Sequence, residues 1–253
     1  MTQQFDKVAI AAAFSRAAHQ YEQFAELQRL TGDILLARVA SRRAGWLLDA
    51  GCGTGWYSRV WQSRGSRVMA LDLSASMLQA CQQKQSAEHF IEADIEAIPL
   101  VDKHVDLAWS NLALQWCSDI HQALAELYRV TQPGGCIAFT TLVSGSLIEL
   151  RQAWQAVDER QPVNTFMTFD EIEQACRPWR AHLQCHPITQ YFPDVVSAMR
   201  SLKGVGATHL HHGRQQQMTT RSQLKRLAAA WPQHQAGYPL SWHIISGVIE
   251  RDE

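Results

Sequence analysis

WLLDAGCGTG, residues 46–55, is the stretch that decides the fold of this chain. A short apolar run leads to Asp49, and glycines then occupy positions 51, 53 and 55. This order predicts a buried strand, a glycine turn and the start of a helix, an arrangement that presents backbone N–H groups to a ligand. A dinucleotide-binding G-x-G-x-x-G pattern would need glycine at position 56, where the chain has Trp56. The spacing therefore disfavours a nicotinamide dinucleotide.

Strand-like and helix-like segments alternate from this stretch onward. Such alternation is typical of a parallel sheet, and we expect its strands at 46–50, 67–72, 89–92, 105–110 and 135–142. Pro133 to Gly135 should end the helix 121–130 before the last of them. Two later strand-like segments, 183–192 and 239–250, are expected to pair antiparallel. The sequence thus predicts an α/β fold with a mostly parallel sheet.

Two segments lie outside this alternation. Residues 1–44 are expected to form an N-terminal helical cap, with Phe14, Tyr21, Phe24 and Leu27 spaced for one face. Residues 193–238 separate the last two strands and hold helical stretches near 194–203 and 220–231. Because this is too long for a hairpin loop, we interpret it as an inserted lid or docking segment.

Length and composition describe an ordinary globular protein. The chain has 253 residues, of which 46% are hydrophobic and 19% charged, and we expect one domain spanning 1–253. No apolar run approaches the ~18 residues of a membrane span, and the N-terminus lacks the layout of a signal peptide. The six cysteines form no C-x-x-C pair and indicate neither disulfides nor zinc. These features favour a cytoplasmic location without membrane contact.

Charge is unevenly distributed along the chain. The net charge of −1 gives no reason to expect nucleic-acid binding. However, Val195 to Ile249 contain no Asp or Glu, and the basic residues there are Arg200, Lys203, Arg214, Arg221, Lys225 and Arg226. This asymmetry indicates either a face for an acidic partner or a solvated surface whose counter-charges come from elsewhere in the fold.

The pattern D-x-G-x-G-x-G resembles the first motif of the class I S-adenosylmethionine (SAM) methyltransferases. The resemblance implies a seven-stranded, mostly parallel, Rossmann-like sheet and SAM as the methyl donor. It also implies that the amino-acid end of SAM is held by the residues of the motif: Asp49, Gly51, Cys52, Gly53 and Gly55.

Later strand ends supply further candidate cofactor-binding residues. Asp72, with Leu73 beside it, ends the second strand, where a carboxylate can accept hydrogen bonds from both ribose hydroxyls. The resemblance implies an adenine-binding role for Asp94 and Ile95. Asp94 could instead belong to an acidic surface turn, since Glu92, Glu96 and Asp102 are close in sequence. Two further candidates are Met77, which could equally be a core methionine, and Asn111, which follows the fourth strand.

Longer stretches resemble one branch of that superfamily, the malonyl-thioester methyltransferases of biotin synthesis. They are FSRAAHQYEQFAELQ (14–28), LAWSNLALQWC (107–117), FTTLVSGSLIELRQAWQAVDER (139–160) and MRSLKGVGATHLHHGR (199–214). This implies methyl transfer from SAM to the free carboxylate of a malonyl group on acyl-carrier protein. The motifs leave open methylation of a free dicarboxylate or other small molecule, or SAM binding without turnover.

Four residues are candidates to contact the acceptor, and they come from the N-terminal segment, from the region after the fourth strand and from the insertion. Arg200 and Lys203 are candidates to orient the carboxylate, or else part of a surface on which an acidic acyl-carrier protein docks, Arg200 to Arg226. Tyr21 and Trp116 are candidate pocket walls, although Tyr21 could be a core aromatic. The three histidines at 209, 211 and 212 match no zinc spacing, and no metal is expected.

Overall fold

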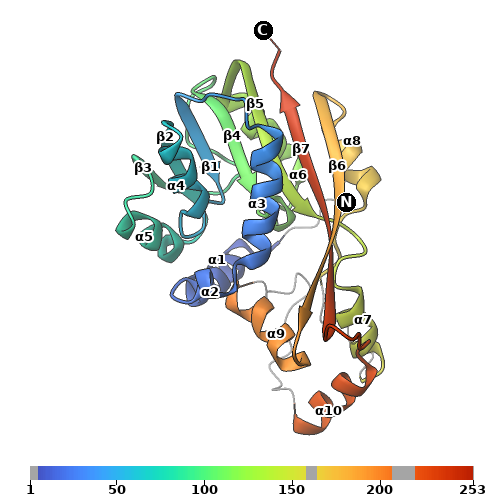
Figure 1. Ribbon diagram of the computed structural model, residues 1–253. Coiled ribbons are helices and arrows are strands. Elements are labelled where there is room, and N and C mark those ends of the chain that lie inside the picture. The colour runs from blue at the N-terminus through green and yellow to red at the C-terminus, as the bar shows by residue number, and fades with distance from the viewer. Residues whose placement is uncertain (1–4, 158–163, 207–219, 253) are drawn as a thin grey trace.

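Seven strands form one mixed sheet in the order β3-β2-β1-β4-β5-β7-β6 (Figure 1). The computed structural model describes residues 5–157, 164–206 and 220–252. Strands β1 to β5 pair in parallel, and β7 lies antiparallel between β5 and β6. This order confirms the predicted sheet. The strands are β1 (Trp46–Ala50), β2 (Arg67–Asp72), β3 (His89–Glu92), β4 (Val105–Asn111), β5 (Thr131–Leu142), β6 (Arg180–Phe192) and β7 (Tyr238–Glu250).

Helices cover both faces of the sheet, as a parallel sheet requires. Successive residues of β1 point to opposite faces: Leu48 packs in the cluster of α6 and α8, whereas Leu47 packs in the cluster of α3 and α4. The described helices are α1 (Lys7–Ala17), α2 (Tyr21–Phe24), α3 (Glu26–Arg38), α4 (Trp56–Ser63), α5 (Ala75–Gln83), the 3-10 helix η1 (Leu114–Trp116), α6 (Ile120–Val130), α7 (Ile148–Gln155), α8 (Phe169–Cys176), α9 (Val195–Gly204) and α10 (Arg221–Ala230).

Strand β6 begins at Arg180, three residues before its predicted start, and the start of β5 differs from the prediction most. Strand β5 begins at Thr131, directly after α6, so Pro133 to Gly135 lie within the strand and do not separate it from the helix. The register against β4 shifts here: Val105 pairs with Thr131, and Leu107 pairs with Cys136. This irregularity loops out the exposed residues between them, which removes the need for an amide hydrogen at Pro133.

Strands β6 and β7 extend beyond the parallel strands and carry a separate hydrophobic cluster (Figure 1). This cluster includes Leu150 from α7, Ala198 from α9, Leu227 from α10 and Trp242 from β7. Leu27 of α3 also belongs to it, so the N-terminal helices and the segment between β6 and β7 share a core. Among the helices of the described residues, none is long and apolar enough to cross a membrane.

Candidate active site

The glycine turn follows the carboxyl end of β1, and its three glycines all have positive φ. A Cβ atom at Gly51 would lie 2.3 Å from the Cβ of Ala113, and one at Gly55 would lie 2.5 Å from Cys81 Sγ. At Gly53 the nearest atoms would belong to Tyr21, 3.8 Å away. Packing therefore requires glycine at 51 and 55, whereas Gly53 leaves space that opens toward Tyr21.

Asp49 is buried at the end of β1, where it accepts a 2.6 Å hydrogen bond from Ser58 Oγ of α4. Burial raises the pKa of this carboxyl to about 7, because the charged form loses its hydration. The bond to Ser58 opposes that shift. Asp49 thus ties the strand to the following helix and also lines a cavity at the glycine turn.

Asp72 ends β2 and faces the same turn. Its Oδ2 accepts from the backbone N–H of Gly53 at 2.9 Å, and its Oδ1 accepts from that of Ser74 at 2.8 Å. Burial raises the pKa of Asp72 to about 6, and these backbone hydrogen bonds oppose the shift. The carboxylate is therefore fixed in position, and each of its oxygens retains acceptor capacity.

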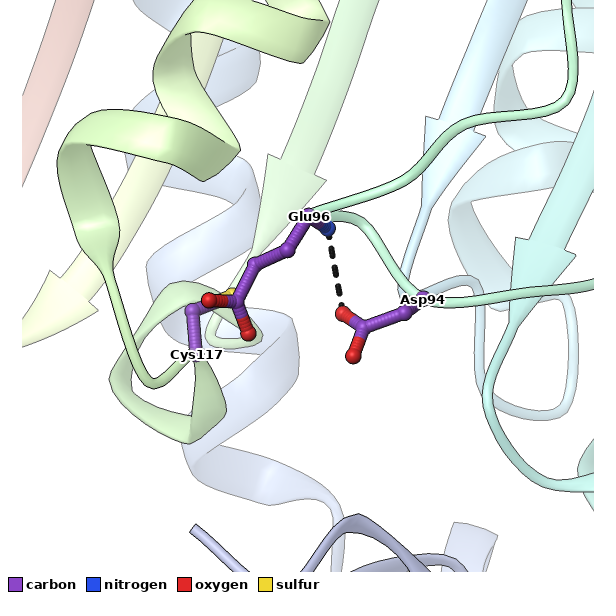
Figure 2. Close-up of side chains that lie close together, drawn as sticks. All are labelled: Asp94, Glu96 and Cys117. Carbon is purple, nitrogen blue, oxygen red and sulfur yellow. Dashed lines mark hydrogen bonds between the residues drawn. The ribbon is translucent and has the colours of Figure 1, made fainter. Parts of the chain in front are cut away.

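Asp94 lies in the loop after β3, where Figure 2 shows its side chain beside Glu96 and Cys117. Its Oδ1 accepts from the Glu96 backbone N–H at 3.0 Å. Lys7 of α1 reaches both carboxylates: its Nζ lies 3.0 Å from Asp94 Oδ2 and also contacts Glu96. Although these three side chains are close enough to suggest metal ligands, the Lys7 ammonium already compensates the two acids.

Three cavities meet at Tyr21. The turn cavity lies against the glycine turn and includes Asp49, Cys52 and Arg29. The cofactor cavity, of about 620 Å³, runs from Gly51 and Gly53 past Asp72 to Asp94. It is also lined by other sequence-predicted residues: Leu73, Met77, Ile95, Asn111 and Trp116. Thus ten of the eleven predicted cofactor residues line these two cavities, and Gly55 packs behind them.

The acceptor cavity, of about 760 Å³, is the third and lies on the side of α9. Its wall is largely apolar, and all four residues that the sequence places on one face of the N-terminal segment line it: Phe14, Tyr21, Phe24 and Leu27. Trp116 borders both this cavity and the cofactor cavity, and its ring meets that of Phe14 edge to face at 5.4 Å. Burial raises the pKa of Tyr21 far above its ordinary value, so its phenol keeps its proton at neutral pH.

The junction between the cavities is rigid. Asn111 Oδ1 accepts from Thr31 Oγ1 at 2.9 Å and from Thr140 Oγ1 at 2.7 Å, and its Nδ2 donates to the Gln28 carbonyl at 2.8 Å. The next residue, Leu112, has φ of +52°, which is unusual for a bulky side chain. Thr140 stabilises this backbone by accepting from the Leu112 N–H. Strain of this kind is often found at functional sites.

Arg200 and Lys203 do not reach these cavities. Both are exposed on α9, while Ser201, Leu202 and Val205 line the acceptor cavity from the opposite side of that segment. The structure thus supplies no contact through which either cation could orient a carboxylate there. Arg221, Lys225 and Arg226 are likewise exposed on α10. Arg214 and the histidines at 209, 211 and 212 lie outside the described residues.

Three residues of the N-terminal helices line the site although they were not predicted from the sequence. Lys7 lines the cofactor cavity and Arg29 lines the turn cavity. The Arg29 guanidinium lies 5.2 Å from the Trp56 ring centroid, and its Nη1 donates to the Glu22 carbonyl at 3.0 Å. Gln28 lines both the turn and the acceptor cavity. For Gln28 the sequence offered one signal: the residue lies within 14–28, a stretch that resembles the methyltransferases named above.

Comparison with known proteins places this chain in a family. Residues 48–139 match a family described as "Methyltransferase domain". The chain is 56% identical over 249 residues to the malonyl-[acyl-carrier protein] O-methyltransferase of Salmonella typhimurium, covering 98% of this chain and 99% of that protein. The protein of the same name from Pectobacterium atrosepticum is 50% identical over 252 residues and is matched over the full length of both chains.

Solved structures agree at the level of the fold. The YcgJ protein from Bacillus subtilis matches with a TM-score of 0.59 at 15% identity, covering 87% of this chain and 98% of that one. Identity this low shows a shared fold alone, whereas the full-length relatives share half or more of their residues with this chain. The chain is therefore a SAM-dependent methyltransferase and belongs to the malonyl-[acyl-carrier protein] O-methyltransferase family.

Proposed function

We propose that this chain transfers the methyl group of SAM to the free carboxylate of a malonyl group on acyl-carrier protein, which gives the methyl ester that primes biotin synthesis. The near-complete match to relatives of that name carries the proposal. The site supports it, because a second cavity, large enough for an acceptor and lined by apolar and amide side chains, meets the cofactor cavity at Tyr21.

The residues around the cofactor cavity fit SAM. Asp72 would accept hydrogen bonds from the ribose hydroxyls, since a carboxylate has acceptor capacity beyond the backbone N–H groups of Gly53 and Ser74. Asp94 and the backbone of Ile95 would face the adenine, with Met77 packed beneath. The missing side chain at Gly53 makes room for the amino-acid end, whose carboxylate Arg29 would pair with.

When bound, SAM supplies an electrophilic methyl group on a positively charged sulfur. The acceptor needs no general base, because a carboxylic acid with a pKa near ~4 is ionised at neutral pH and is itself the nucleophile. One O–C bond forms, one C–S bond breaks, and no proton moves. The protein contributes alignment, which can supply roughly 7–11 kcal/mol of the barrier. Tyr21 and Trp116 would hold the acceptor at the junction of the cavities.

The segments outside the sheet would exclude water from this junction. In the proposed single domain of 1–253, the N-terminal cap of 1–44 contributes Phe14 and Phe24 to the acceptor cavity. The insertion of 193–238 contributes Leu202 and Val205 to the same cavity. Enclosing the reacting groups between these two segments would strengthen every electrostatic interaction inside.

Labelled SAM tests the proposed function directly. Incubation with malonyl-acyl-carrier protein should transfer label to the carrier, and mild base should release it as methanol because a methyl ester hydrolyses. Acetyl-carrier, which lacks the free carboxylate, should stay unlabelled. Label that survives base would mean methylation of nitrogen or carbon and would contradict the proposal. Labelling of a free dicarboxylate in preference to the carrier would favour a small-molecule enzyme.

Acyl-carrier protein would dock on the exposed cations of α9 and α10, because acyl-carrier proteins are acidic. We expect the double change Arg200→Glu and Lys203→Glu to raise KM for malonyl-carrier about 10-fold, as reversal of rim charges slows encounter. KM for a small malonyl thioester and the Kd of S-adenosylhomocysteine should not change. The control reverses two exposed cations elsewhere, Arg177→Glu with Arg180→Glu. Equal losses with carrier and small thioester would rule out docking on α9.

A further inference from the structure

The acceptor cavity has an unusual charge pattern for a site that would receive a carboxylate. Among the described residues lining it, the one charged side chain is Glu26, an acid. The polar groups are neutral and include four glutamines: Gln23, Gln28, Gln115 and Gln190. A negatively charged substrate group in this cavity would therefore contact amides and hydroxyls. The described residues that line the cavity offer it no cationic side chain.

Gln115 is held at both ends of its side-chain amide. Its Nε2 donates to the Leu112 carbonyl at 2.7 Å, and its Oε1 accepts from Thr141 Oγ1 at 3.4 Å. That carbonyl belongs to Leu112, which has φ of +52° and whose N–H is fixed by Thr140. Because a primary amide has two hydrogens on nitrogen, this bond leaves Gln115 one further donor.

Gln28 stands between the acceptor and turn cavities. Its backbone carbonyl is fixed by Asn111 Nδ2 at 2.8 Å and by Thr31 Oγ1 at 3.2 Å. Its side-chain Oε1 is buried and has no hydrogen-bond partner. A half turn of the amide would exchange this oxygen for the nitrogen, which can donate. The Gln28 amide therefore keeps unused hydrogen-bonding capacity beside the two cavities.

Neutral donors suit the chemistry of this transfer better than a cation does. A carboxylate and a sulfonium lose their opposite charges as the methyl group moves, so the transition state is less charged than the ground state. A protein cation on the carboxylate would stabilise the ground state more, and only interactions that favour the transition state accelerate the reaction. An apolar cavity with neutral donors positions the carboxylate and leaves its oxygen nucleophilic.

We propose that the malonyl carboxylate is held in the acceptor cavity by the side-chain amides of Gln28 and Gln115, without a counter-ion from the part of the chain that the structure describes. The proposal rests on the proposed function and names the residues that select a carboxylate at that site. It assigns the exposed cations of α9 to the carrier surface alone.

The decisive experiment compares a small malonyl thioester with the corresponding acetyl thioester, which lacks the carboxylate and serves as a competitive inhibitor. Gln115→Leu should raise KM for the malonyl compound at least 10-fold and leave the Ki of the acetyl compound and the Kd of S-adenosylhomocysteine within 2-fold. A merely structural role would move all three constants together and would overturn the proposal. Gln174→Leu, on the exposed face of α8, is the control.

Adding a cation provides the opposite test. Gln115→Lys should lower KM for the malonyl thioester and lower kcat at least 10-fold, since the carboxylate would then be held more tightly in the ground state. An unchanged or higher kcat would overturn the proposal. So would a rise in KM for the small thioester in Arg200→Met or Arg214→Met that exceeds the rise in Gln115→Leu. If the unmodified chain labels no malonyl thioester, the proposed function fails; if it does and Gln115→Leu is normal, only this inference fails.

Discussion

Asp72→Asn is expected to weaken the binding of S-adenosylhomocysteine about 100-fold while the chain stays folded. Each hydrogen bond to a charged acceptor contributes roughly 1.5–3 kcal/mol, and the ribose would make two of them to Asp72. A loss of about 2.7 kcal/mol corresponds to a factor of 100 in Kd. Asparagine keeps one oxygen for the backbone N–H of Gly53 or Ser74, so the fold should persist.

Titration calorimetry with S-adenosylhomocysteine measures this change, and thermal unfolding of the free chain checks the fold. Asp170→Asn is the matched control, because Asp170 is exposed at the start of α8, away from the three cavities. A Kd for Asp72→Asn within 3-fold of the unmodified chain would show that Asp72 serves only to fix the glycine turn. The cofactor arrangement proposed above would then be wrong at its central residue.

The sheet could be predicted from sequence because the residues that mark each strand and its end are adjacent in the sequence. Apolar runs such as 46–50 and 67–72 are short and end in a carboxylate or a glycine, so each strand end is marked. Those strand ends meet at one edge of a parallel sheet, which is why the predicted cofactor residues come together. The start of β5 was missed because Pro133 and Gly134 are normally turn residues, and only pairing with β4 makes a bulge of them.

The acceptor cavity could not be predicted in the same way. Its lining depends on the directions in which side chains from distant segments of the chain point. Charge and a distinctive motif favoured Arg200 and Lys203, but helical phase places them away from the cavity. A signal was present: Val195, Ala198, Leu202 and Val205 are spaced as one apolar face, which leaves the two cations on the other side. Lys7 and Gln28 had no such signal, since Lys7 contacts Asp94 and the Gln28 carbonyl contacts Asn111, each more than 80 residues away in sequence.

Two glycines of the turn, Gly55 and Gly53, are expected to fail in different ways when replaced by alanine. Gly55→Ala should destabilise the chain by about 3 kcal/mol, because a left-handed backbone costs roughly 1–2 kcal/mol and forced overpacking a further 1–3 kcal/mol. The overlap would be with Cys81 Sγ at 2.5 Å and Ser86 Cβ at 2.7 Å. Denaturant unfolding measures the loss.

Gly65→Ala is the control for the backbone cost, since Gly65 has φ of +93° and a Cβ there would meet nothing within 4 Å. It should lose only about 1–2 kcal/mol. A loss equal to that of Gly55→Ala would show that the backbone alone, and not packing against α5, requires glycine at 55.

Gly53→Ala tests whether glycine at this position is needed for cofactor binding or for the stability of the fold. Its φ is +54° and its Cβ would approach Tyr21 no closer than 3.8 Å, so its stability should match that of Gly65→Ala. The added methyl group would instead occupy the edge of the cofactor cavity, and the Kd of S-adenosylhomocysteine should rise at least 10-fold. If Gly53→Ala binds normally, the amino-acid end of the cofactor does not lie against this turn. If it unfolds like Gly55→Ala, glycine is required for folding at both positions, and its occurrence at 53 does not indicate a ligand.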